Sequence, residues 1–251
     1  MARLFETHSH LFMEPLCRDI SGVLERAFSA GVERLLVPSV SSSNWDTCAD
    51  LSLLPGISCA LGIHPWWAAE GIEVEELRER LIKTGAVAIG EIGLDWKTEV
   101  PRQTQYAVFK KQLELASQLN IPVILHCRGA FEEMLQLLKD NPVRGVIHGW
   151  SRDFQLMNRF IEAGLSISFG GAVTRHDAKK CRESAARVPF DRFVLETDSP
   201  SMGLKGVSPG ECEPGHVADV LWAFAEIRGE ATEDTAGAAW ANSVALFGGN
   251  A

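Results

Sequence analysis

Short apolar runs in this chain repeatedly end on residue types that bind metal ions. The first run leads into Glu6-Thr7-His8-Ser9-His10, and the last leads into Glu196-Thr197-Asp198. Four runs between them end at His64, Glu91, His126 and His148. A β-strand delivers its terminal side chains to one end of its sheet, so residues far apart in the chain can meet there. The pattern predicts a metal site built from strand ends.

Eight β-type runs alternate with longer segments whose apolar residues have helical spacing. The expected strands are residues 4–5, 34–37, 58–61, 87–89, 123–125, 146–147, 165–168 and 193–195. Two further helical patterns, Val217–Ile227 and Thr232–Leu246, follow the last strand. Eight βα units with little left over predict a (β/α)8 TIM barrel with its metal centre at the C-terminal ends of the strands.

An open, doubly wound sheet is the competing architecture. The strands are continuous apolar runs, as expected of a parallel sheet covered by helices in either fold. Ligand types at six well-separated strand ends favour a closed ring, because an open sheet would hold its edge strands far apart. The 251 residues are within the size that one α/β barrel reaches, so one domain over 1–251 is expected.

Charge and composition exclude several classes of protein. The formal net charge of −9 provides no basic face for wrapping duplex nucleic acid. No apolar run reaches the roughly 20 residues of a membrane span, and no signal-peptide apolar region precedes His8. The six cysteines are dispersed without a CxxC pair, which indicates reduced thiols. We therefore expect a cytoplasmic protein without a membrane or an obligate protein partner.

His8 and His10 stand two apart, so both imidazoles share one side of an extended strand end. Any one of these strand-end residues could equally be a helix cap or a satisfied polar group in the core. Taken together, they indicate a ligand set: His8, His10, Glu91, His126, His148 and Asp198. Four imidazoles and two carboxylates exceed one tetrahedral site and suit two ions that share a carboxylate. Glu91, between Gly90 and Gly93, is the expected bridging ligand.

Further residues near these strand ends are candidates for contact with substrate. His64 suits substrate contact or proton donation if the metal shells are already full. Arg128 follows His126 by two and can grip a phosphate or carboxylate, with Arg152 a weaker candidate. Four tryptophans follow ligand-bearing strands: Trp66, Trp67, Trp96 and Trp150. Aromatic faces there can stack on bases or serve as packing, and we assign Trp150 to substrate binding.

Two neighbours of the ligands have less certain roles. Asp95 is either an outer-shell group of the metal centre or a cap for the following turn. Cys127 adjoins His126, but alternation directs its side chain to the opposite face, so a buried thiol is expected. The chain has no GxSxG elbow, no Walker loop and no dinucleotide fingerprint after its first strand.

Taken as a set, the motifs resemble the TatD-type deoxyribonucleases, metal-dependent hydrolases of the amidohydrolase-like barrel group, over almost the whole chain. The segments that carry the resemblance are Thr7-His8-Ser9-His10, Gly62-Ile63-His64-Pro65, Gly90-Glu91-Ile92-Gly93-Leu94-Asp95, His126-Cys127-Arg128, His148-Gly149-Trp150-Ser151 and Glu196-Thr197-Asp198-Ser199-Pro200. The resemblance implies the same six ligands of a two-metal centre and assigns water activation to Asp198.

Three positions depart from the family pattern. Glu6 replaces the usual Asp, and Trp150 stands where the family often has Phe. Cys212-Glu213-Pro214 replaces the family's Asn-x-Pro after the last strand, which puts substrate contacts there in doubt.

The leading hypothesis is phosphodiester hydrolysis by a water that two divalent ions activate, with Asp198 and Glu91 as catalytic residues. His64 or a water would protonate the leaving oxygen. An acidic exterior with one positive pocket favours 3′-to-5′ trimming of single-stranded DNA or RNA ends. The histidine-rich shell suits Zn, Mn, Fe or Ni better than Mg. The alternatives are hydrolysis of an amide, ester or lactone in a small metabolite, and a catalytically silent binding scaffold.

Overall fold

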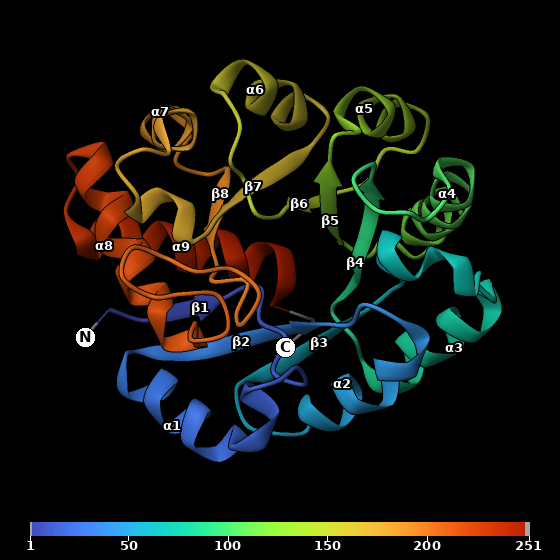
Figure 1. The fold of residues 1–251 in the computed structure, drawn as a ribbon, viewed down its shortest axis with the longest axis horizontal. Coiled ribbons are helices and arrows are strands. Elements are labelled where there is room, and N and C mark those ends of the chain that lie inside the picture. Colours follow the sequence, from blue (N-terminus) through green and yellow to red (C-terminus); the bar gives the residue numbers. More distant parts are fainter. Residues whose placement is uncertain (1, 249–251) are drawn as a thin grey trace.

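In the computed structural model, which describes residues 2–248, eight parallel strands form one sheet in the order in which they occur in the chain (Figure 1). The strands are β1 (Leu4–Glu6), β2 (Val32–Pro38), β3 (Ile57–Leu61), β4 (Ala88–Asp95), β5 (Val123–Arg128), β6 (Gly145–Ile147), β7 (Leu165–Phe169) and β8 (Phe193–Leu195). Seven of the eight expected runs lie wholly within these strands, and the eighth, 87–89, begins one residue before β4, so the strand prediction is confirmed.

Helices follow the strands and surround the sheet (Figure 1). They are α1 (Ile20–Ser29), α2 (Trp45–Leu51), α3 (Val74–Thr84), α4 (Arg102–Leu119), α5 (Phe131–Asp140), α6 (Phe154–Glu162), α7 (Lys179–Arg187), α8 (Val217–Arg228) and α9 (Thr232–Phe247). Short 3₁₀ turns are η1 (Leu16–Arg18), η2 (Ser42–Asn44), η3 (Pro65–Glu70), η4 (Gly171–Thr174) and η5 (Pro214–His216). Among residues 2–248, no helix has both the length and the apolar character needed to cross a membrane.

The segments that follow β8 and β1 close the sheet. The Thr7 amide donates to the carbonyl of Leu195 at 3.3 Å, and the Asp198 amide donates to the carbonyl of His8 at 3.0 Å. His10 continues this seam by donating its amide to Ser199 at 2.8 Å. The first and last strands therefore meet, as a (β/α)8 barrel requires and an open sheet does not.

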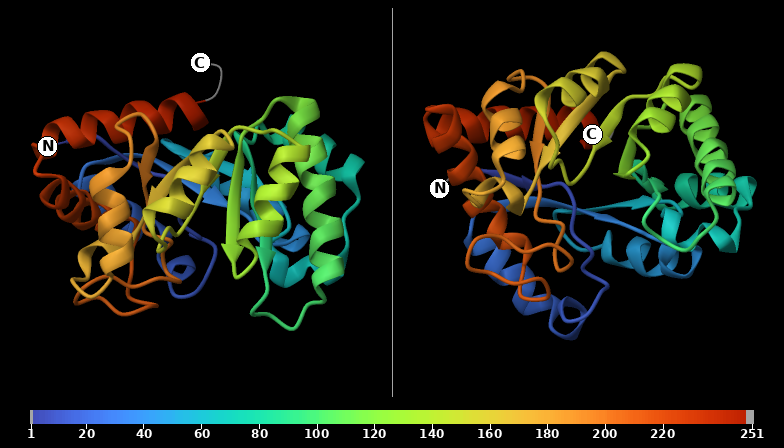
Figure 2. Two further views of the ribbon diagram at one scale, coloured as in Figure 1. Left: turned by 90° about the horizontal axis from the view of Figure 1, so that it is seen from above. Right: turned by 45° about the horizontal axis from the view of Figure 1, so that its top comes forward.

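One apolar residue from each of seven strands contributes to a cluster inside the barrel. These inward residues are Phe5, Leu36, Ala60, Ala88, Ile124, Val146 and Val194. Phe247 of α9 completes their cluster, and Trp240 packs against it. Because α9 lies across the N-terminal ends of the strands (Figure 2), that end is plugged by apolar side chains. Functional residues of such barrels lie at the opposite end, where the strands have their C-terminal ends.

Candidate metal centre

Several residues of the candidate metal centre continue the inward-facing positions of the barrel strands, because alternate residues of a strand point to the same side. His126, His148 and Glu196 each lie two residues beyond an inward core residue of β5, β6 or β8. Their side chains therefore project towards the barrel axis just above the apolar layer. Burial of polar groups here must be offset by pairing among them.

Glu91 reaches the axis because β4 is irregular between Ile89 and Ile92, where its register with β5 shifts. Such bulges redirect a side chain next to a functional site. The flanking glycines permit close contact with β5. A Cβ on Gly90 would lie 2.6 Å from Cβ of Ile124. A Cβ on Gly93, whose φ is +145°, would lie 2.0 Å from the carbonyl oxygen of His126.

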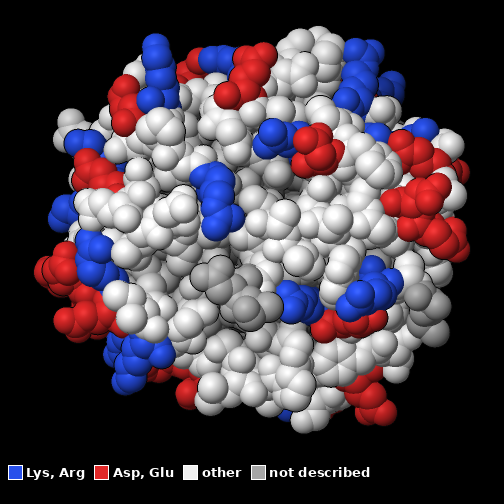
Figure 3. Space-filling model, turned by 180° about the vertical axis from the view of Figure 1, so that it is seen from behind, with Lys and Arg blue, Asp and Glu red and all other residues white. Residues whose placement is uncertain are grey.

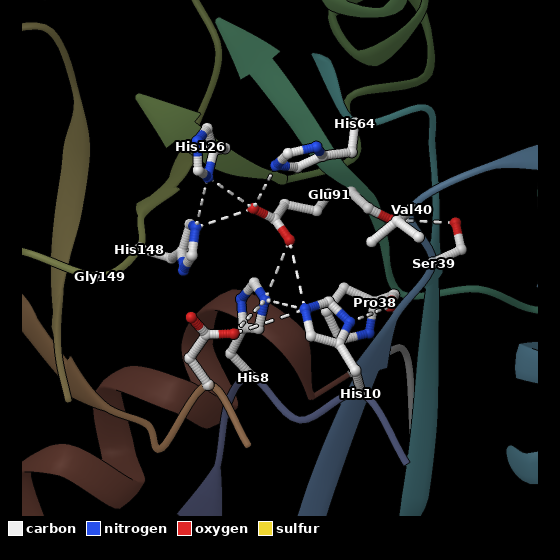
Figure 4. Close-up of polar contacts among 12 residues, drawn as sticks. His8, His10, Pro38, Ser39, Val40, His64, Glu91, His126, His148 and Gly149 are labelled. Carbon is white, nitrogen blue, oxygen red and sulfur yellow. Dashed lines mark hydrogen bonds and ion pairs between the residues drawn. The ribbon is translucent and has the colours of Figure 1, made fainter. Parts of the chain in front are cut away.

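The two carboxylate oxygens of Glu91 face two different groups of imidazoles (Figure 4). Oε2 lies 3.2 Å from Nε2 of His8 and 3.5 Å from Nε2 of His10. Oε1 lies 2.8 Å from Nε2 of His148 and 3.0 Å from Nδ1 of His126. This division is the one expected of a bridging carboxylate.

Asp198 belongs to the His8 and His10 side of the centre. Its Oδ1 lies 3.5 Å from Nε2 of His10 and 3.9 Å from Nε2 of His8. The backbone of Asp198 has a φ of +54°, an uncommon conformation for a residue with a side chain. Two backbone hydrogen bonds hold that conformation. The Asp198 amide donates to the carbonyl of His8, and the Met202 amide donates to the carbonyl of Asp198.

Hydrogen bonds to the outer ring nitrogens distinguish two of the candidate ligands, His10 and His126, from His64. Nδ1 of His10 lies 3.1 Å from the carbonyl of Pro38 and donates to it, so Nε2 is the ring nitrogen turned towards Glu91 and Asp198. Nε2 of His126 likewise faces Asp95 at 3.3 Å. In contrast, Nδ1 of His64 accepts the amide of Trp66, so the proton of neutral His64 is on Nε2, 3.4 Å from Oε1 of Glu91. His64 is therefore a donor to Glu91 in this arrangement.

Electrostatics agree with this assignment. Burial alone would raise the pKa of Glu91, but its imidazole neighbours, His148 above all, hold it well below its usual value. Burial would also lower the pKa of His10, yet hydrogen bonds with Asp198 and Glu91 raise it to about 9. For His64, burial wins over the attraction of Glu91 and lowers the pKa to about 4, so the ring is neutral at pH 7.

The residues present fit metal ions. Within residues 2–248, the ion pairs of Glu91 and Asp198 are with imidazoles, and no Lys or Arg neutralises either carboxylate. Ligand atoms of His8, His10 and Asp198 lie within 4.8 Å of one another. A compact set of nitrogen and carboxylate donors in a buried place is the composition of a transition-metal site.

Two buried glutamates support the centre from outside, and the sequence reasoning gave neither a role. Glu196 accepts the Gly149 amide and the Ser168 hydroxyl, and its carboxylate faces Nδ1 of His148 at 3.6 Å. Oε1 of Glu6 accepts the amides of His8 and Thr197, which joins β1 to the segment after β8. The signal for Glu196 was available, because it stands two residues beyond the inward Val194.

Asp95 makes the contacts that both of its expected roles require. Its Oδ1 accepts the Lys97 amide at 2.8 Å and caps the turn. Its Oδ2 faces His126 and also accepts the indole N–H of Trp66 at 2.7 Å.

A cavity of about 420 Å³ opens beside His126, His148 and Asp198. Arg128, Arg152, Trp66 and Trp150 line it, so the predicted contacts Arg128 and Trp150 are at its wall. Trp150 is only 2% exposed and bonds its indole N–H to Arg152, whereas Trp66 is 50% exposed. The expectation of a buried Cys127 thiol is wrong in part. This residue is partly exposed and lines the same cavity at the open end of β5, although burial raises its pKa to about 12.

The segment Cys212-Glu213-Pro214, which differs from the family pattern, makes its contacts away from this cavity. Cys212 is buried, and the Glu213 carboxylate accepts two hydrogen bonds from Arg26 of α1, at 2.7 and 2.8 Å. None of the three residues lines the cavity beside Asp198.

A closed parallel barrel with histidines and carboxylates at the C-terminal ends of its strands defines a class of metal-dependent barrel hydrolases. Comparisons with known proteins agree. The family model described as TatD related DNase matches residues 5–248. The chain therefore belongs to the TatD family of metal-dependent hydrolases, which confirms the resemblance seen in the sequence.

Individual relatives match along their full length. The uncharacterized metal-dependent hydrolase YjjV of Escherichia coli is 34% identical, with 98% of each chain covered. The uncharacterized metal-dependent hydrolase YabD of Bacillus subtilis is 32% identical, with 97% of this chain and 98% of the relative covered. The crystal structure of YjjV superposes with a TM-score of 0.93 over 99% of both chains, at 32% identity.

Proposed function

We propose that this hydrolase cleaves phosphodiester bonds and trims single-stranded DNA or RNA from the 3′ end. The observation that carries the proposal is the cavity beside Asp198, where the guanidinium groups of Arg128 and Arg152 and the exposed ring of Trp66 meet the ligand cluster. Guanidinium groups suit phosphate and an aromatic face suits a base. The description of the matching family model, TatD related DNase, supports the same substrate class.

The surface supports an end-directed enzyme. The chain carries a net charge of −9, and on the one face drawn in Figure 3, seen from behind the view of Figure 1, acidic and basic side chains are interspersed. Few phosphates would be neutralised outside the pocket, so long duplex tracts would bind weakly. A cavity of about 420 Å³ has the size of a small-ligand site and admits a strand end. A cytoplasmic location belongs to the same proposal.

In this proposal the histidines and carboxylates around Glu91 would hold two divalent ions. His8, His10 and Asp198 serve the Oε2 side, while His126 and His148 serve the Oε1 side. Zn, Mn, Fe and Ni suit this donor set better than Mg. Such ions polarise phosphoryl oxygens and lower the pKa of a bound water.

The protein side chains then divide the remaining work. Asp198, whose side chain is 13% exposed and lines the cavity, takes the proton of the attacking water. Arg128 and Arg152 hold the phosphate. A water supplies the proton to the leaving oxygen. His64, the other candidate donor, is neutral, does not line the cavity and directs its Nε2 proton to Glu91, so it supports the carboxylate instead.

The test is incubation of the purified protein with a 5′-labelled single-stranded oligonucleotide and Mn, Mg, Zn or chelator. We expect a metal-dependent ladder that shortens from the 3′ end, absent in His126→Ala and retained in His176→Ala, which changes an exposed histidine outside the centre. An intact oligonucleotide under every metal, with turnover of small amides, esters or lactones, would overturn the nuclease assignment. Processive degradation of duplex that spares single-strand ends would overturn the end preference.

A further inference from the structure

Trp66 is an exposed aromatic residue held rigidly at the mouth of the cavity. It directly follows His64 and Pro65 in η3, and half of its surface is open. Its indole N–H donates to Asp95 at 2.7 Å, and its backbone amide donates to His64 at 3.1 Å. The His64 ring meets the indole edge to face, with centroids 5.1 Å apart. A large apolar ring fixed in this way offers a preorganised face to a ligand.

The same carboxylate oxygen that holds Trp66 also faces a metal-ligand candidate. Oδ2 of Asp95 lies 2.7 Å from Nε1 of Trp66 and 3.3 Å from Nε2 of His126. On its other side, the His126 ring presents Nδ1 to Glu91 at 3.0 Å. One oxygen therefore sets the orientation of a ring at the cavity mouth and of a ring in the ligand cluster.

Asp95 is itself immobilised. Its side chain is buried, and its second oxygen accepts the Lys97 amide. Its backbone exchanges two hydrogen bonds with the amide of Gln105: the Asp95 N–H donates to Oε1 and its carbonyl accepts from Nε2, both at 2.8 Å. Since Gln105 is buried on α4, the carboxylate is tied to the barrel scaffold rather than to a loop.

We propose that Trp66 is the base-stacking residue of the substrate cavity and that Asp95 is the positioning residue that fixes Trp66 and His126 through one oxygen. This inference rests on the proposed nuclease function. It assigns the recognition element as the π-face of an unpaired nucleobase, which an aromatic ring binds with little sequence preference. Inside a duplex both faces of a base are covered by the neighbouring base pairs, so the residue favours single strands.

The first experiment compares wild type, Trp66→Ala and Trp66→Phe on two oligonucleotides, one with a normal 3′-terminal base and one with an abasic 3′ end. The matched control is Trp222→Ala, which removes a tryptophan that is 61% exposed on α8 and does not line this cavity. Binding is measured in chelator by fluorescence anisotropy, and KM and kcat are measured with Mn²⁺.

For Trp66→Ala we expect oligonucleotide affinity to fall about tenfold or more, with kcat changed by less than about threefold. Trp66→Phe keeps a ring and should retain most of the affinity. The abasic end should bind wild type and Trp66→Ala alike. Equal affinities of wild type and Trp66→Ala for the normal end would overturn the stacking role while leaving the nuclease function intact. Failure of wild type to cleave any nucleic acid would instead refute the function itself.

The second experiment separates Asp95 from Trp66 by the affinity for Mn²⁺ alone, measured by calorimetry on metal-free protein whose fold is checked by circular dichroism. Asp95→Asn should weaken Mn²⁺ binding about tenfold or more, because outer-shell partners of ligand imidazoles contribute at that level. It should also weaken oligonucleotide binding in chelator. Trp66→Ala should leave Mn²⁺ affinity within about twofold of wild type. Unchanged Mn²⁺ affinity in folded Asp95→Asn would overturn the positioning role.

Discussion

The imidazole rings of His8 and His148 stack, with centroids 4.2 Å apart and planes 18° apart, although the two residues follow β1 and β6. Both turn Nε2 towards Glu91. Neither Nδ1 has a hydrogen-bond partner among residues 2–248, and both face the Glu196 carboxylate, at 4.0 and 3.6 Å. Glu196 is therefore the common electrostatic support of two imidazoles that belong to opposite sides of the centre.

Glu196→Gln should weaken metal binding about 10- to 100-fold, because it removes the negative charge that favours the Nδ1–H tautomer of both rings. Titration of metal-free protein with Mn²⁺ gives the affinity. The matched control is Glu183→Gln on the exposed surface of α7, which should bind Mn²⁺ as wild type does. An unchanged affinity in Glu196→Gln would mean that Glu196 only anchors Gly149 and Ser168.

Asp198→Asn should lower kcat about 10²- to 10⁴-fold, because an amide cannot take the proton of the attacking water. Steady-state kinetics at saturating Mn²⁺ separates this loss from weaker metal binding. Asp219→Asn on α8, which does not line the cavity beside Asp198, is the control and should keep wild-type kcat. A kcat within a few-fold of wild type in metal-saturated Asp198→Asn would assign the base to another group.

Metal should stabilise the fold, since ions would neutralise two carboxylates that have only imidazole partners in the described chain. A ligand at 100 times its Kd adds about 2.7 kcal/mol to the free energy of unfolding. Thermal unfolding with Mn²⁺ and with chelator measures the shift. Glu91→Ala should abolish it, because Glu91 contacts both groups of imidazoles; a shift of wild-type size in that variant would contradict the bridging assignment.

Cys181 should make stability fall at alkaline pH. Burial raises the pKa of its thiol to about 12, above the usual value of 9.0. The unfolded chain therefore loses this proton first. The contribution of the protonated thiol to the free energy of unfolding is complete below pH 9 and declines as the pH rises towards 12. The stability difference between wild type and Cys181→Ala should shrink by up to ~1.4 kcal/mol per pH unit in that window. Urea unfolding of both proteins across this pH window measures the difference in stability. A difference that does not change with pH would contradict the prediction.

Gly93→Ala should destabilise the protein by at least about 3 kcal/mol, because the new Cβ would lie 2.0 Å from a backbone oxygen of β5 at a φ of +145°. Gly85→Ala is the comparison, since its φ of +67° is strained but no atom lies within 4 Å of the new Cβ. It should cost about 1 kcal/mol. Chemical denaturation measures both, and equal losses would show that the contact with β5 can relax.

The order of residues was enough to predict the eight strands and the family. Each strand contains a short apolar run, and both the period of the pattern and the motifs are local properties of the chain. For the same reason His8, His10, Glu91, His126, His148 and Asp198 could be named as candidate ligands before any geometry, because each ends or follows an apolar run. The structure places Glu91 within β4 and His126 within β5. The two final helices were also predicted, with α8 and α9 ending one residue later than expected.

Only the tertiary structure decided which atoms face one another. The bulge in β4 places the two oxygens of Glu91 between separate groups of imidazoles, and the seam between the segments after β1 and β8 places Asp198 beside His10. The proton on Nε2 of His64, the shared oxygen of Asp95 and the exposure of Trp66 rather than Trp150 follow from hydrogen bonds between distant residues. Such contacts arise when the barrel closes, and no periodicity along the chain encodes them.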